Sequence, residues 1–156
     1  LSRAFSFASS DSWAQAMIAH VWSEGAGQRY LAVDPASGTT ESGALMTTRY
    51  NDFDILRWLG LGQSSTEIFA DERMGEWHCV EARVRLNDSG LENGEFQLWI
   101  NDALEAERLG LNWVGSFDAY GINAVYLENY WNGGAPQAQG RVLDNFVVST
   151  ERIGCP

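Results

Sequence analysis

The sequence has little positive charge and no long apolar run. Ten basic residues stand against 21 acidic ones, and the formal net charge is −11. A field of this sign repels nucleic-acid phosphates and anionic lipid headgroups, and no basic patch interrupts it, so we expect no nucleic-acid partner. The sequence contains no run of about 18 apolar residues, so no membrane insertion is expected either.

Cysteine is scarce, and the two present, Cys79 and Cys155, belong to no CxxC or Cys/His cluster. A zinc site is therefore not expected. The two thiols either form one disulfide across the C-terminal half or stay unpaired, and the sequence leaves both possibilities open. The chain opens at Leu1 with no signal-peptide h-region, so we interpret it as a processed or trimmed piece.

Aromatic residues are abundant: seven Trp, seven Phe and five Tyr in 156 residues, against three Pro. Aromatic side chains favour strands, and they also form stacking surfaces for flat ligands. The length fits one domain, which we expect to span residues 1–156, whether the chain is complete or a fragment.

Alternation of apolar and polar residues dominates the chain, and helical periodicity is rare. Only short helices are expected, near residues 12–15 and 104–108. Pro35 is predicted to end a strand, and Asn101-Asp102 is predicted to turn a hairpin. Strands are predicted over residues 16–23, 29–34, 44–50, 54–59, 65–70, 77–86, 95–100, 121–131 and 142–149. This many short strands with Gly/Asn/Asp turns predicts a sandwich or a barrel.

Three segments of the second half carry a resemblance to a known superfamily. They are VRLN (84–87), which follows Trp77, NGEFQLWIND (93–102) and LDNFVVS (143–149). Together they resemble the concanavalin A-like lectin/glucanase superfamily, in particular its polysaccharide-lyase-like members. The resemblance implies an all-β fold, a two-sheet antiparallel jelly-roll sandwich. It also implies a concave sheet that binds a polysaccharide or oligosaccharide, and an extracellular or periplasmic location.

The alternation assigns side chains to the two faces of each strand. In the strand at 16–23, Met17, Ala19 and Val21 are expected in the core, so that His20 and Trp22 face the concave side. In the strand at 121–131, Tyr126, Glu128 and Tyr130 share one face, while Val125 and Leu127 are expected to point inward. In the strand at 77–86, Glu81, Arg83 and Arg85 share the polar face.

Aromatic rings stack on sugar rings, while carboxylates and guanidinium groups hydrogen-bond sugar hydroxyls. The expected ligand-binding residues are therefore Trp22, Arg49, Arg83, Asn123, Glu128 and Tyr130. The alternative is structural: Tyr126 and Tyr130 complete a hydrophobic cluster, and Glu128 pairs with an arginine.

Two kinds of catalysis can be compared with the motifs present. The glucanase branch of the superfamily carries Glu-x-Asp-x-x-Glu on one strand, a run that this sequence lacks, so glycoside hydrolysis is not expected. β-Elimination on a uronate polymer needs a base, an acid and groups that neutralise the carboxylate. His20 and Tyr126 could serve as base and acid, with Arg49, Arg83 and Asn123 as neutralising groups.

Three observations weigh against elimination. The net charge of −11 opposes an anionic substrate, and the Arg-x-Glu-x-Arg and Gln-Ile-His signatures of the alginate lyases in this fold are absent. His20 can equally be an ordinary structural histidine, and His78, on the same face as Val80, is interpreted as structural.

Asn51, Asp52 and Asp54 place three oxygen-bearing side chains close together, and calcium prefers such ligands. The spacing lacks an EF-hand pattern, so a solvated turn is the main expectation and a structural calcium the alternative. No other metal or cofactor is expected.

The leading hypothesis is carbohydrate recognition by an aromatic-lined concave sheet. The alternative is a polysaccharide lyase that acts by β-elimination. A third possibility is a structural or adhesion module whose exposed aromatic side chains bind another protein.

Overall fold

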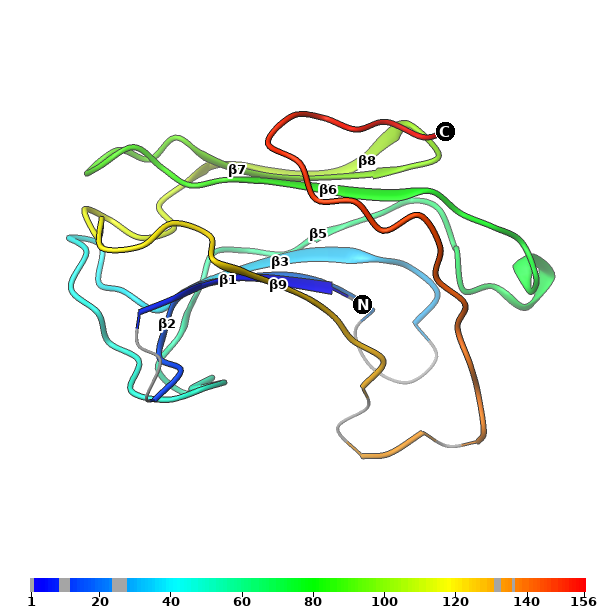
Figure 1. Cartoon of the computed structure of the whole chain (residues 1–156), viewed down its shortest axis with the longest axis horizontal. Coiled ribbons are helices and arrows are strands. Elements are labelled where there is room, and N and C mark those ends of the chain that lie inside the picture. The colour runs from blue at the N-terminus through cyan, green and yellow to red at the C-terminus, as the bar shows by residue number, and fades with distance from the viewer. Residues whose placement is uncertain (1, 9–11, 24–27, 131–132, 136) are drawn as a thin grey trace.

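The computed structural model describes residues 2–8, 12–23, 28–130, 133–135 and 137–156. It confirms an all-β, two-sheet antiparallel jelly-roll sandwich (Figure 1). The larger sheet has the order β4-β3-β2-β1-β9, with β5 paired to β3, and the smaller sheet has the order β6-β7-β8. The elements are β1 Ser2–Phe7, β2 Gln15–Trp22, β3 Ala32–Ser37, β4 Arg57–Trp58, β5 Gly62–Gln63, η1 Asp71–Arg73, β6 Val80–Arg85, β7 Gly94–Ile100, β8 Ala103–Leu111 and β9 Ala124–Leu127.

The main core lies between the two sheets. Met17, Ala19 and Val21 of β2 point into it, as the alternation predicts, and they meet Phe96 and Leu98 of β7. The larger sheet is bowed, and its concave face points away from the smaller sheet (Figure 1). The remaining side chains of β1, β2 and β9 therefore line that concave face.

The β7–β8 hairpin turns at Asn101 and Asp102, as predicted. Both residues have positive φ, 50° and 65°, which is the backbone of a two-residue hairpin turn whose twist matches its strands. Because this turn directs the chain back along β7, residues 104–108 form part of β8. The prediction of a short helix there is wrong. The helix expected near residues 12–15 is also wrong, because β2 begins at Gln15.

The strand expected to stop at Pro35 instead continues to Ser37. Pro35 lies between the two short partners of β3: β4 pairs with Ala36 and Ser37, and β5 pairs with Ala32 and Val33. The Leu59 N–H donates to the Pro35 carbonyl at 2.9 Å. Since Pro35 has no N–H to return, the Leu59 carbonyl accepts a bond from Arg108 Nη2 at 3.3 Å instead.

Several other strand predictions need correction. Residues 44–50 make only the isolated bridge Thr39↔Leu45, because the Thr47 hydroxyl bonds to the Gln15 carbonyl of β2 and Thr48 bonds to nearby Asp52. Of residues 54–59 only β4 is a strand, and residues 65–70 form turns.

The last two predicted strands also differ from expectation. Of residues 121–130 only β9 is a strand, and it lies at the edge of the larger sheet. Val125 lies opposite Ala4, which packs against the main core, so Val125 and Leu127 share the core-side face as assigned. At this edge they are nevertheless 40% and 44% exposed. Trp131 lies outside the described residues. Residues 142–149 are exposed and form no strand.

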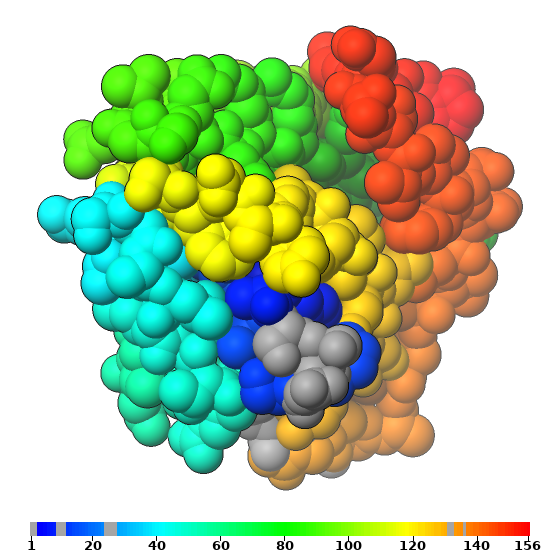
Figure 2. Space-filling view, turned by 60° about the vertical axis from the view of Figure 1, so that its left-hand side comes forward, coloured from blue at the N-terminus to red at the C-terminus, as the bar shows by residue number. Residues whose placement is uncertain are grey.

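At one end of the sandwich, the segment around residues 40–45 packs against the segment around 112–117 (Figure 2). Ser116 Oγ donates to the Ser42 carbonyl at 2.5 Å. Gly43 and Gly115 have φ of 99° and 57°, and an added Cβ on either would lie within 2.5 Å of the opposing backbone. Only glycine permits this close approach.

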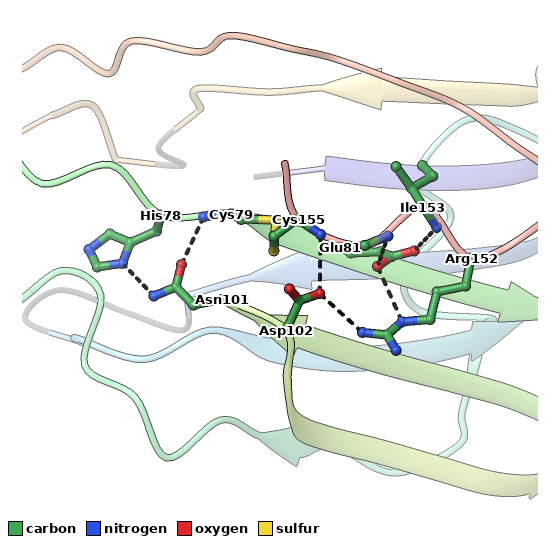
Figure 3. The surroundings of a disulfide bond; sticks show 9 residues. His78, Cys79, Glu81, Asn101, Asp102, Arg152, Ile153 and Cys155 are labelled. Carbon is green, nitrogen blue, oxygen red and sulfur yellow. Dashed lines mark hydrogen bonds and ion pairs between the residues drawn. A yellow bond between two sulfur atoms is a disulfide. The ribbon is translucent and has the colours of Figure 1, made fainter.

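The two cysteines form a disulfide, with Cα atoms 5.8 Å apart (Figure 3). The C-terminal tail is further bound to the edge of the smaller sheet. Glu81 accepts bonds from the backbone N–H groups of Ile153 and Gly154, and Asp102 accepts one from Cys155. Among the described residues, no helix is long and apolar enough to cross a membrane.

Candidate functional site

One transverse row on the concave face brings together a histidine, an arginine and a tyrosine. His20 of β2 lies opposite Arg3 of β1, and Arg3 lies opposite Tyr126 of β9. Directly opposed residues of antiparallel strands project from the same face with neighbouring Cβ atoms about 4.5–5.5 Å apart. The row therefore places an imidazole, a guanidinium group and a phenol side by side.

Arg3 is held by two partners on this face. Its Nε lies 2.6 Å from Glu128 Oε2, and its Nη1 donates to Asn51 Oδ1 at 3.0 Å. The side chains of Arg3 and Glu128 are only 11% and 21% exposed. Arg141 supports the same point, because its Nη2 donates to the Glu128 carbonyl at 2.7 Å. The structure thus contains the arginine pairing that was considered for Glu128, and its arginine is the one in the row.

His20 has no exposed surface. Its Nδ1 lies 2.9 Å from the Asp34 carbonyl, which requires the proton on Nδ1 and leaves the lone pair on Nε2. Nε2 is buried without a hydrogen-bond partner among the described residues. Burial lowers the pKa of His20 to about 3, and the charge of Arg3 adds to the shift, so the ring is neutral at neutral pH.

Aromatic rings surround His20. The Trp22 ring stacks on it with centroids 4.4 Å apart, and the Trp58 ring stacks at 5.6 Å. Phe53 completes this group at 6.3 Å. Trp22 is partly buried, while Trp58 and Phe53 are 44% and 38% exposed. The group presents indole and phenyl surface beside the row.

A second aromatic group lies on the other side of the row. Tyr126 packs on Phe5 and Phe7, with centroids 5.0 and 6.2 Å apart, and Tyr50 packs on the same two rings. Burial raises the pKa of Tyr50, and the charges of Arg3 and Glu128 also act on it. Tyr126 therefore completes a hydrophobic cluster and also lies in the row.

The other expected ligand-binding residues lie apart from the row. Arg49 is 69% exposed and pairs with Asp52 at 3.2 Å. The side-chain amide of Asn123 accepts from the Phe7 N–H and donates to the Phe7 carbonyl, both at 2.9 Å, so it extends the β1–β9 pairing. Tyr130 lies beyond the end of β9 and is 72% exposed.

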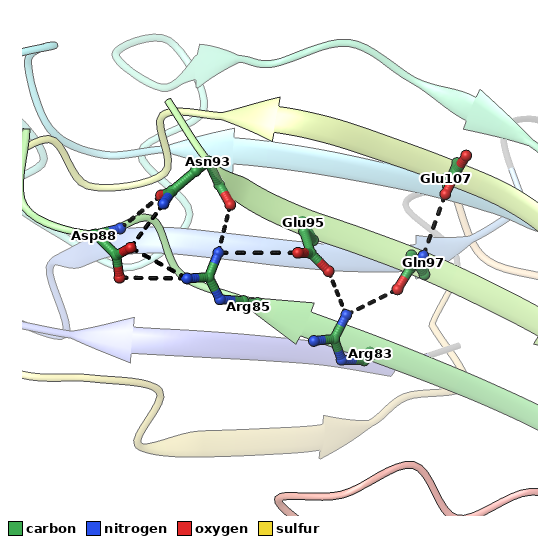
Figure 4. Close-up of polar contacts among 7 residues, drawn as sticks. All are labelled: Arg83, Arg85, Asp88, Asn93, Glu95, Gln97 and Glu107. Carbon is green, nitrogen blue, oxygen red and sulfur yellow. Dashed lines mark hydrogen bonds and ion pairs between the residues drawn. The ribbon is translucent and has the colours of Figure 1, made fainter. Parts of the chain in front are cut away.

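Arg83 lies on the outer face of the smaller sheet, across the core from His20 (Figure 4). It forms an ion pair with Glu95 and donates to Gln97 Oε1 at 2.9 Å. Gln97 in turn donates to Glu107 at 3.2 Å. The alternation assigned Arg83 to the polar face correctly, but that face belongs to the other sheet.

Sequence reasoning missed Arg3 and Trp58, and it considered Asn51 only as a calcium ligand. The signal for Arg3 is the alternation Arg3-Ala4-Phe5-Ser6-Phe7, in which every second residue is large. Asn51 and Trp58 give no comparable signal, because a turn and a two-residue strand bring them to the face.

In the oxygen-rich turn at 51–54, the side chains of Asn51 and Asp52 bond to other protein groups. Asp52 accepts bonds from the Thr48 N–H, the Thr48 hydroxyl and Arg49, and the Thr48 N–H in particular lowers the pKa of Asp52. Within the described part of the chain, no three His, Cys, Asp or Glu side chains gather closely enough to hold a metal ion.

The concave face of this bowed antiparallel sandwich combines aromatic rings with an arginine and a carboxylate, which are groups that can stack on and hydrogen-bond sugars. The family model for polysaccharide lyase 14 matches residues 22–140, and the chain belongs to this family. Its function therefore concerns polysaccharides. No curated protein and no solved structure matches the chain.

Proposed function

We propose that this protein is a polysaccharide lyase that cleaves a uronate-containing polymer by β-elimination on the concave face of its larger sheet. The observation that carries the proposal is the row of His20, Arg3 and Tyr126 on three adjacent strands. The row supplies the three functions that elimination needs: a proton acceptor, a cation and a proton donor.

Arg3 binds the uronate carboxylate in this proposal. The printed sequence contains no lysine, so all ten of its basic residues are arginines. A guanidinium group stays protonated and holds a carboxylate through paired N–H groups, which suits charge neutralisation but not proton abstraction. Glu128 and Asn51 engage Nε and Nη1, while Nη2 has no partner among the described residues.

His20 and Tyr126 transfer the protons. The C5 proton passes to His20 Nε2, the electron pair of the C5–H bond forms the C4–C5 double bond, and the bond from C4 to the glycosidic oxygen breaks. The Tyr126 hydroxyl protonates that oxygen. A substrate carboxylate beside the ring raises the pKa of His20 from its low value, because a nearby negative charge favours the imidazolium.

Access to His20 requires a local movement. Trp22, Trp58 and Phe53 surround the ring, which has no exposed surface. We therefore expect the loop that carries Phe53 to shift when the polymer binds.

The test is to add alginate, glucuronan or pectate and follow the ultraviolet absorbance of the unsaturated product. Tyr126→Phe removes only the hydroxyl and is expected to lower kcat about 100-fold or more, as is His20→Gln. Tyr120→Phe, at an exposed tyrosine outside the row, is the matched control and should keep the wild-type rate. If the wild-type protein releases no unsaturated product from any of the three polymers, the lyase proposal is wrong.

A second candidate, polysaccharide recognition without cleavage, is favoured by one specific observation. His20 is fully covered and Arg3 already has a carboxylate partner, whereas Trp58 and Phe53 offer exposed ring surface. This candidate would be supported if polysaccharide gels retained the wild-type protein but not Trp58→Ala, and if no product absorbance appeared.

We also propose that the fold belongs to the concanavalin A-like superfamily and that the protein is extracellular or periplasmic. The bowed concave sheet supports membership of the concanavalin A-like superfamily. The disulfide supports an extracellular or periplasmic location, because such bonds persist in oxidising compartments.

A further inference from the structure

Two adjoining hollows share Tyr30, at the end of the larger sheet where β2 finishes and β3 begins. One has a volume of about 510 Å³, and its lining includes Tyr30, Glu67, Glu72 and Arg73. The other, of about 60 Å³, is lined by Tyr30, Ala32 and Gln63 among others. The larger volume lies within the range of roughly 300–1,000 Å³ typical of ligand sites.

The smaller hollow continues the concave face, and Tyr30 joins it to the larger one. Ala32 lies opposite Trp22 on one side and opposite Gln63 on the other, so these three side chains share a face. Trp22 belongs to the aromatic group beside His20. Tyr30 lies four residues before Asp34, the β3 residue opposite His20, so it is offset from the row by about 13 Å along the strand direction at roughly 3.3 Å per residue.

The Tyr30 ring is fixed in place. Its hydroxyl donates to Glu67 Oε1 at 2.5 Å, and Arg29 Nη1 contacts Glu67 Oε2 at 3.4 Å. The hydrogen bond from Tyr30 keeps the pKa of Glu67 below its usual range, so Glu67 remains a charged acceptor. A ring held this way loses little freedom when a ligand stacks on it.

The wall that faces Tyr30 is anchored as well. Glu105 accepts four bonds from Ser65 and Thr66, from both backbone N–H groups and both hydroxyls, over 2.5–3.1 Å. The Phe69 N–H donates to the Arg29 carbonyl at 3.1 Å. The hollow is thus a built site and not a gap between loose loops.

We propose that the Tyr30 hollow is a distal subsite that binds one sugar unit of the polysaccharide chain through its hydroxyl groups. The Tyr30 ring supplies a stacking surface, while Glu67, Glu72 and Arg73 bond the hydroxyls. Two carboxylates against one guanidinium group in the lining select a hydroxyl-bearing part of the chain over a sugar carboxylate. The inference rests on the proposed polysaccharide function.

The experiment is affinity electrophoresis through gels that contain alginate or glucuronan, which measures binding independently of cleavage. Tyr30→Ala and Glu72→Ala are each expected to weaken retention about three- to tenfold, the loss that one stacking or charged contact produces. Tyr120→Ala and Glu92→Ala, at exposed positions away from the hollow, are the matched controls and should behave as wild type.

The outcomes separate the two proposals. Wild-type retention by both Tyr30→Ala and Glu72→Ala would overturn the subsite while leaving the polysaccharide function standing. Failure of the wild-type protein to bind either polymer, together with no unsaturated product from alginate, glucuronan or pectate, would overturn both. Weakened retention without any product absorbance would support the subsite and contradict only the lyase assignment.

Discussion

At the scale of single residues, His20 gives the protein a pH-dependent stability. The folded protein keeps the ring neutral down to the pKa of about 3, whereas the unfolded chain protonates it near pH 6.5. Between these values the unfolded state binds more protons, so the free energy of unfolding decreases as the pH falls. From pH 7 to pH 5 this amounts to about 2 kcal/mol. Urea unfolding at the two pH values measures it.

The chain has two histidines, so a matched control is available. His20→Gln should lose most of this pH dependence, and His78→Gln should retain it. The carboxylates with lowered pKa, Asp52 and Glu67, lose their contribution only at lower pH. If the free energy of unfolding decreased equally from pH 7 to pH 5 in His20→Gln and in wild type, His20 would not be the cause of this pH dependence.

Side-chain faces were predictable where alternation is local. His20 and Trp22 lie on the concave face because Met17, Ala19 and Val21 fill the core. Which residues meet across strands was not predictable, since the pairing of Arg3 with His20 and Tyr126 depends on register between distant segments. Arg83 shows the same limit: its face was evident, but not the sheet to which it belongs.

At the scale of elements, Pro35 and Arg108 form a coupled pair through the Leu59 carbonyl. Arg108→Met leaves that carbonyl without its donor and is expected to cost about 1–2 kcal/mol of stability. In a Pro35→Ala background the new N–H can replace the lost donor, so Arg108→Met should cost less by about 0.5–1 kcal/mol. A double-mutant cycle by urea unfolding measures this coupling, and strictly additive costs would exclude it.

The disulfide, like the tail contacts, attaches the C-terminal segment to the smaller sheet. The bond joins residues 76 positions apart, and replacing both cysteines with alanine should lower the free energy of unfolding by about 2–4.5 kcal/mol. Thermal unfolding with and without reductant is the measurement. Reductant should lower the Tm of wild type and leave the Cys79→Ala/Cys155→Ala variant unchanged; a shift in the variant would show another cause.

Elements defined by local signals were predicted best. β2, β6, β7 and the turn at Asn101 follow from alternation and turn residues alone. Pro35 within β3 was not predictable, because a proline is tolerated there only between two separate partner strands. Residues 142–149 have a strand-like sequence but form no strand. A strand needs a partner from elsewhere in the chain, and the local sequence does not reveal whether one is present.

At the scale of the whole molecule, the net charge of −11 opposes approach of an anionic polymer, while the arginine of the row attracts a carboxylate at short range. Salt screens the long-range repulsion first, because the Debye length falls from about 30 Å at 0.01 M to about 10 Å at 0.1 M ionic strength. Arg3 is only 11% exposed, so its contact is screened much less. We therefore expect kcat/KM on long alginate or glucuronan chains to rise between these two ionic strengths and to fall only at higher salt.

Initial rates across a sodium chloride series measure this dependence. A steady decrease from the lowest salt would instead mean that guanidinium groups dominate the field over the concave face, with the surplus carboxylates too distant to matter.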